Sequence, residues 1–176
     1  MADLRLIALA LVACADASAR DLAARPDAHD APPATSGVKW PVRWTAQPGI
    51  AAAAKTALGR AGEGVEAFGE PAMGCYGVWM TMRASGEATD VAEQLLRGLV
   101  VDAKAKRSLA IKDVVKPTAA EGPQGIVSLR FESSPYRGRL RARVGKGRIV
   151  ALACFASQRE PAACETACTV VLGAMP

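Results

Sequence analysis

Four arginines recur at every second position in the segment YRGRLRARVGKGR, which covers residues 136–148. They are Arg137, Arg139, Arg141 and Arg143. Side chains alternate between the two faces of a β-strand, so a strand here would place all four guanidinium groups on one face, about 6.7 Å apart. Arginines at this spacing can hold carboxylate or phosphate groups through charge-assisted hydrogen bonds.

The preceding segment extends this surface. Arg130 and Glu132 alternate with apolar Val127, Leu129 and Phe131, so five arginines would face one nearby carboxylate. Two interpretations stay open. The surface is either a solvated sheet face, or a face that recognises phosphorylated lipid headgroups, acidic glycan or an acidic protein partner. Nucleic acid is not expected, because no aromatic side chains are interleaved as a stacking platform.

The register of the hairpin after this segment decides what the arginines lie against. A three-residue turn at residues 145–147 would set Arg141 opposite Ala151 and Arg139 opposite Ala153. It would also set Arg137 opposite Phe155, where the guanidinium could stack on the ring. A two-residue turn would reverse this register, because a shift of one residue moves every side chain to the other face.

We expect four of the five cysteines to form two disulfides. They are Cys75, Cys154, Cys164 and Cys168. An even number suits an exported domain, and four cysteines allow three connectivities. Cys164 and Cys168 lie four apart on one face of an expected helix, and Cys154 ends the strand before it. We therefore favour the pairs Cys154–Cys164 and Cys75–Cys168. The rival interpretation is a metal site on Cys164-x-x-x-Cys168, but this spacing is wrong for a zinc knuckle.

Residues for catalysis are missing from the expected folded part. The single histidine, His29, lies in the N-terminal region, and no G-x-S-x-G occurs. The G-x-G patterns at residues 62–64 and 145–147 do not stand between a strand and a helix, as a phosphate loop requires. Glutamates are available, but nothing pairs them for glycoside hydrolysis. We expect no enzymatic activity, no catalytic residue, no cofactor and no metal.

The apolar patterns predict the elements that position these residues. Strands are expected at residues 38–45, 75–83, 109–115, 125–132, 136–144 and 148–155, and helices at residues 50–60, 89–106 and 161–174. The clearest helix is 89–106, where Val91, Leu95 and Leu99 form one apolar stripe. Consecutive strands pair antiparallel, so the prediction is an α+β fold with an antiparallel sheet packed against a long helix and a C-terminal helix.

This order of elements resembles the PsbP-like fold, shared by the photosystem II extrinsic subunit, Mog-type Ran-binding proteins and several bacterial lipoproteins. The similar segments are WTAQPG, GCYGVWMTM, GIVSLRFESSPYRGRLRARVGKGRIVALACFA and ACETACTVVLGAM. The Ala-rich stretch at residues 50–60 departs from the usual early strands. The resemblance implies an α/β sandwich and no shared catalytic residues, since better-known members assist or bind other proteins.

The N-terminus predicts export. Residues 6–13 form an unbroken apolar run that is too short to span a bilayer but suits a signal peptide. Residues 11–14, LVAC, resemble a bacterial lipobox, which implies that residues 1–13 are removed and Cys14 carries the lipid. Ala15 supplies no inner-membrane retention signal, so outer-membrane sorting is implied. The alternative is an ordinary secretory signal cleaved near Ala17 or Ala19.

Residues 14–37 are rich in Ala, Asp and Pro and predict a disordered tether, followed by one domain at residues 38–176. The net charge of +5 favours anionic partners without identifying one. We expect a non-catalytic lipoprotein, anchored to the outer membrane and facing the periplasm, that binds or assists another envelope protein. The alternative is a module that binds an anionic lipid or glycan through the arginine-rich face.

Overall fold

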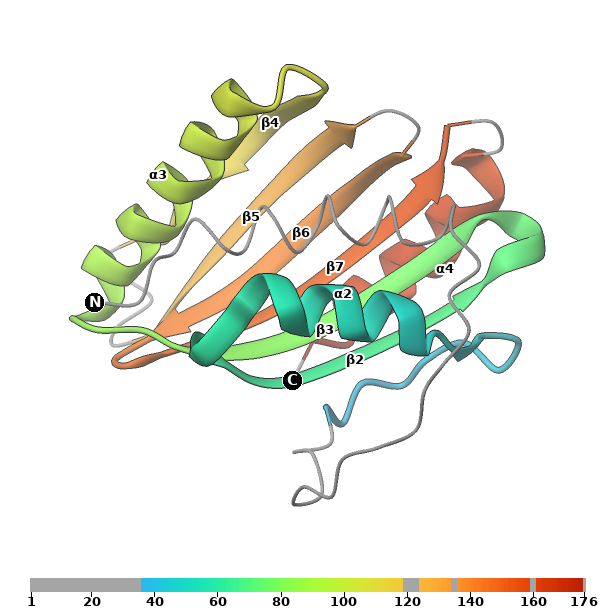
Figure 1. Cartoon of the computed structure of the whole chain (residues 1–176), viewed down its shortest axis with the longest axis horizontal. Helices are drawn as coiled ribbons and strands as arrows, with labels where there is room; N and C mark the ends of the chain where they lie inside the picture. Colours follow the sequence, from blue (N-terminus) through green and yellow to red (C-terminus); the bar gives the residue numbers. More distant parts are fainter. Residues whose placement is uncertain (1–35, 119–123, 134–135, 159–160, 176) are drawn as a thin grey trace.

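The computed structural model describes residues 36–118, 124–133, 136–158 and 161–175, and these form one antiparallel sheet with helices on both faces (Figure 1). The strands are β1 (Thr45–Ala46), β2 (Gly62–Glu70), β3 (Cys75–Arg83), β4 (Leu109–Val115), β5 (Gln124–Ser133), β6 (Tyr136–Gly145) and β7 (Arg148–Ser157). The helices are α2 (Pro48–Leu58), α3 (Ala88–Ala105) and α4 (Pro161–Gly173), with 3-10 turns at Gly59–Ala61 and Pro71–Met73.

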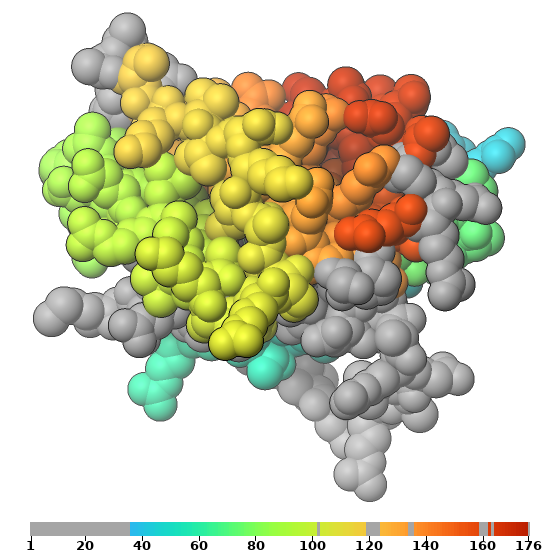
Figure 2. All heavy atoms as spheres, turned by 90° about the horizontal axis from the view of Figure 1, so that it is seen from above, coloured from blue at the N-terminus to red at the C-terminus, as the bar shows by residue number. Residues whose placement is uncertain are grey.

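The strand order is β1-β2-β3-β7-β6-β5-β4, so the last four strands form a meander. This confirms the predicted α+β class and the predicted pairing of consecutive strands. Helices α2 and α3 lie on one face, while α4 lies on the other, across β7 and β3 (Figure 1). Figure 2 shows α3 and β4 beside one another at the surface.

Two apolar layers hold these parts together. The larger lies under α2 and α3 and includes Met80, Leu95, Leu140, Ile149 and Phe155. The smaller lies under α4 and includes Trp44, Trp79, Leu152, Val171 and Leu172. Strands β3 and β7 are therefore apolar on both faces, as central strands covered on both sides must be. Burial of apolar side chains in the smaller layer helps to keep α4 on the sheet.

The segment at residues 38–45 was predicted as a strand, but only Thr45 of that range belongs to one. Pro41 has no backbone N–H for a ladder, and its carbonyl instead accepts a hydrogen bond from the Trp44 amide at 2.9 Å. Trp40 and Trp44 stack and join the apolar layer under α4. The segment thus covers the sheet rather than extending it.

Strand β2 was not predicted. Its sequence, GEGVEAFGE, contains three glycines, which are depleted in strands. Gly69 shows why one of them is tolerated, because a Cβ there would lie 2.5 Å from the Cys75 carbonyl oxygen and 2.7 Å from the Tyr76 ring. A glycine at this position therefore allows β2 to pack closely against β3, although the propensities of its residues do not predict a strand.

The predicted signal peptide, Cys14 and most of the predicted tether lie outside the described residues. Ser36, within the predicted tether, is buried. Its amide donates a hydrogen bond to Glu66 Oε1 at 2.8 Å, and its hydroxyl donates to Glu66 Oε2. Glu66 lies opposite Trp79 on the α4 face of β2, so the chain enters the fold on that face.

Candidate anion-binding groove beside α4

The turn between β6 and β7 contains two residues, Lys146 and Gly147, and not three. Gly145 continues the strand and pairs with Arg148, while Gly147 takes the positive φ of 74° that closes the turn. The predicted register is therefore wrong. Arg137 lies opposite Ala156, Arg139 opposite Cys154 and Arg141 opposite Leu152.

This shift moves the arginines to the α4 face of the sheet. Leu152, Cys154 and Ala156 all belong to the apolar layer under α4, so the arginines share their face with it. The predicted stacking of Arg137 on Phe155 is also wrong. Phe155 lies opposite Gly138 and packs into the other layer against Tyr76 and Tyr136.

The arginines differ in their partners. Arg139 Nη2 lies 2.8 Å from Glu165 Oε1 on α4, and Arg130 Nε lies 3.3 Å from Asp113 Oδ2. Arg141 Nη1 donates to the Leu172 carbonyl at 3.2 Å, at the end of α4 where a helix favours positive charge. Arg137 and Arg143 form no ion pair with any described residue.

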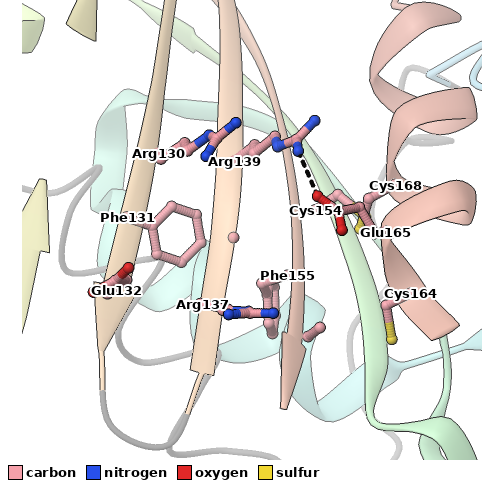
Figure 3. A pocket seen from close by; sticks show the side chains of 12 residues that line it. Arg130, Phe131, Glu132, Arg137, Arg139, Cys154, Phe155, Cys164, Glu165 and Cys168 are labelled. Carbon is pink, nitrogen blue, oxygen red and sulfur yellow. Dashed lines mark hydrogen bonds and ion pairs between the residues drawn. A yellow bond between two sulfur atoms is a disulfide. The ribbon is translucent and has the colours of Figure 1, made fainter. Parts of the chain in front are cut away.

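Two cavities run along the side of α4 and share Arg130 and Arg139, and Figure 3 shows the first of them. We call them together the α4 groove. The first, about 180 Å³, is lined by Arg130, Phe131, Glu132, Arg137, Gly138, Arg139, Cys154, Phe155, Ala156, Cys164, Glu165 and Cys168. The second, about 260 Å³, is lined by Asp113, Ser128, Leu129, Arg130, Arg139, Leu140, Arg141, Thr169, Leu172 and Gly173.

These volumes are large enough for a side chain or a small anion, since a cavity of about 150 Å³ holds benzene. Four of the five predicted arginines line the groove, and Arg143 lies on the same face outside it. In Figure 3, Arg130 and Arg139 project side by side from β5 and β6, and Glu165 approaches Arg139 from α4.

Charges in the groove are mixed, with positive charge in excess. Lys112 Nζ lies 2.8 Å from Glu132 Oε2, and this hydrogen bond and charge hold the pKa of the Glu132 carboxyl below its usual value. Arg137, directly opposite Glu132, lowers the same pKa further. Glu132 is therefore ionised at neutral pH, and its charge is already balanced by Lys112.

The four predicted cysteines form two disulfides, as expected, but the favoured pairing is wrong. The bonds are Cys75–Cys164 and Cys154–Cys168, with Cα–Cα distances of 5.5 and 5.4 Å. Helix α4 runs back along β7, so Cys164 lies near the end of β7, where Ala156 pairs with Cys75. Four helical residues rise about 6 Å, close to the 6.7 Å of two strand residues, which brings Cys168 over Cys154.

The disulfides fix one wall of the groove. Glu165 follows Cys164 directly, and both bonds tie α4 to the central strands β3 and β7. The two cysteines proposed as metal ligands in the rival interpretation are therefore committed to disulfides. Among the described residues, no group of three or more His, Cys, Asp or Glu side chains is placed to hold a metal ion.

Sequence reasoning missed the α4 side of the groove, above all Glu165 and Thr169. Two contacts determine where α4 lies. Arg139 lies opposite Cys154, and the Cys154–Cys168 disulfide brings the first turns of α4 to Arg139. Both contacts depend on the two-residue turn and on the correct disulfide pairing.

No protein-family model matches this chain, and no curated protein sequence is significantly similar to it. In the part of the chain that the structure describes, no helix is both long enough and apolar enough to cross a membrane. The groove therefore has to be interpreted from its own geometry and charge.

Proposed function

We propose that this chain is a non-catalytic exported lipoprotein that binds an acidic segment of another envelope protein in the α4 groove. The observation that carries the proposal is the row of four arginines, Arg130, Arg137, Arg139 and Arg141, along two adjoining cavities. The resemblance to the PsbP-like family belongs to the same proposal. The order of long helix, four-strand meander and closing helix supports it.

Rigidity of the groove supports a binding role. The arginines stand on paired strands, and α4 is held by two disulfides. A preformed site loses less conformational entropy when it binds, so more of the contact energy appears as affinity. Arginine is also enriched at protein interfaces, where its planar fork recognises carboxylates.

The mixture of charges favours a protein over a uniform polyanion. Asp113, Glu132 and Glu165 stand among the arginines. Such carboxylates repel a ligand that presents only negative charge, whereas a protein segment can match both signs. The groove thus suits acidic side chains that are spaced along a peptide.

One observation supports the second candidate, an anionic lipid or glycan. Ser36 enters the fold on the α4 face, the same face as the groove. The 22 residues from Cys14 to residue 35 would span about 25 Å as a flexible chain. A lipid on Cys14 would therefore keep the groove near the membrane surface, where anionic headgroups lie.

Site-specific photo-cross-linking in cells distinguishes these candidates. A photo-reactive residue at Thr169, exposed on α4 beside the second cavity, is expected to cross-link one envelope protein at an acidic peptide. The same residue at Arg97, on α3 across the sheet, serves as the control. Cross-links at Thr169 only to lipid or lipopolysaccharide would favour the second candidate, and equal yields at both positions would refute a role of the groove.

A further inference from the structure

The Arg139–Glu165 pair occupies the middle of the groove. Arg139 lines both cavities, and Glu165 lines the first. Any anion that enters to bind Arg139 meets a carboxylate already 2.8 Å from Nη2. A ligand can therefore bind Arg139 only if the ion pair with Glu165 opens or makes room for it.

We propose that Arg139 is a carboxylate-recognition site that Glu165 occupies in the free protein, and that an acidic side chain of the partner displaces Glu165. This inference rests on the proposed function, since it concerns the same groove. It adds the chemical class of the ligand and an internal contact that competes with it.

The pair can open without moving the fold. Disulfides hold α4 on both sides of Glu165, at Cys164 and Cys168, so the helix backbone stays fixed. The Glu165 side chain is 62% exposed, whereas that of Arg139 is 35% exposed. Rotation of the Glu165 side chain into solvent is therefore enough to free the guanidinium.

The internal occupant shows that the site at Arg139 accepts a carboxylate. Arg139 pairs with Glu165, and Arg130 in the same groove pairs with Asp113. A carboxylate from the partner reproduces the contact that it replaces. Next to Arg139, Arg137 has no ion pair with any described residue and can hold a second acidic side chain of the same segment.

The need to displace Glu165 lowers the affinity of the groove for a carboxylate ligand, and removal of the Glu165 charge restores that affinity. An exposed ion pair contributes only a small free energy, which corresponds to roughly a 1.5- to 5-fold change in an equilibrium constant. Glu165→Gln is expected to tighten binding of a carboxylate ligand by that factor. Glu93→Gln changes the net charge equally on an exposed position of α3, across the sheet, and is expected to leave affinity unchanged.

The test is calorimetric titration of the purified chain, its disulfides intact, with a blocked acidic peptide in which glutamates are spaced by alanine and one lysine. The same peptide with glutamine in place of each glutamate, inorganic phosphate, and vesicles of phosphatidylcholine with phosphatidylglycerol serve as comparison ligands. The expected result is a gain in affinity for Glu165→Gln with the acidic peptide, no gain for Glu93→Gln, and loss of binding for Arg139→Gln. Binding should also shift the carboxyl carbon resonance of Glu165, because that group loses its partner.

Each other outcome overturns the inference in a recognisable way. If the acidic peptide binds and Arg139→Gln weakens its binding, but Glu165→Gln gives no gain, the binding role of the groove stands and the displacement is refuted. If Glu165→Gln improves binding only to phosphate or to the vesicles, the carboxylate assignment is refuted. If neither the wild type nor Glu165→Gln binds the acidic peptide, the inference and the proposed protein-binding function both fail.

Discussion

Removing the two disulfides one at a time should destabilise the domain unequally. The perturbations are Cys75→Ala with Cys164→Ala, and Cys154→Ala with Cys168→Ala. The first bond closes 89 residues of chain and the second closes 14. Loop-closure entropy gives about 4.6 kcal/mol for the first bond and about 3.0 kcal/mol for the second at 25 °C.

The difference between the variants is better defined than either value. All four cysteines are buried, so each double replacement removes a similar amount of apolar contact. The first variant should therefore be less stable than the second by about 1.6 kcal/mol. For a domain of this size that is about 3–6 °C in Tm.

Urea unfolding of both variants and the wild type measures this difference, with the m-value as a check on two-state behaviour. Equal stabilities, or a less stable second variant, would refute the loop assignment. Proteolytic mapping of the oxidised wild type checks the same point chemically. Cleavage after Glu165 separates Cys164 from Cys168, and Cys75 should remain linked to the peptide that ends at Glu165.

Three further predictions concern packing, charge and the anchor. Gly138→Ala should cost about 1–3 kcal/mol in urea unfolding, because its Cβ would lie 2.5 Å from the Cys154 carbonyl oxygen and 2.6 Å from both Phe131 Cζ and Phe155 Cβ. Gly49→Ala, with nothing within 4 Å, is the control, and an equal loss there would contradict the packing argument. Lys112→Met should raise the pKa of Glu132 toward its usual value of 4.5 in a carboxyl NMR titration, since the hydrogen bond that lowers it is lost. Any stabilisation from the Lys112–Glu132 pair is present above that pH and disappears as pH falls through the lowered pKa, so an unchanged titration would refute the contact. Cys14→Ser should release the protein from membranes in fractionation without changing the unfolding of the domain, and continued membrane attachment would contradict lipidation at Cys14.

The sequence predicted the elements that have strong local patterns. The stripe of Val91, Leu95 and Leu99 placed α3 within one residue at each end, and strand β3 was predicted with its observed bounds. Side chains alternate along this strand, and Tyr76, Val78, Met80 and Met82 all belong to the layer under α2 and α3. In these elements local periodicity and burial agree.

Elements determined by long-range contact could not be predicted in the same way. Strand β2 depends on the close approach of Gly69 to Tyr76, which no local pattern shows. Residues 38–44 look like a strand because they are apolar and aromatic, but Trp40 and Trp44 are buried against the sheet face instead. Strand propensity reflects how well a side chain suits a half-buried surface, so it does not distinguish a strand of the sheet from a segment packed on its face.

The arginines of the candidate site were predicted from the sequence, but the residues that lie beside them were not. Four arginines of the groove followed from simple alternation along β6 and β5. Their neighbours did not, because one residue of turn length at Gly145 decides whether the arginines lie over Ala153 or beside Cys154 and α4. Glu165, which the groove geometry makes central, could be found only through that register.

The central claim is that the arginines of the α4 groove bind an anionic partner, and calorimetric titration of an acidic peptide into charge-reversal variants tests it most directly. The test variant is Arg139→Glu with Arg141→Glu. The matched control is Arg97→Glu with Arg107→Glu, an equal change in net charge at exposed positions outside the groove. The account predicts that the wild type and the control bind, more weakly as salt rises, while the groove variant does not. Equal binding by both variants, or an equal loss in both, would contradict it.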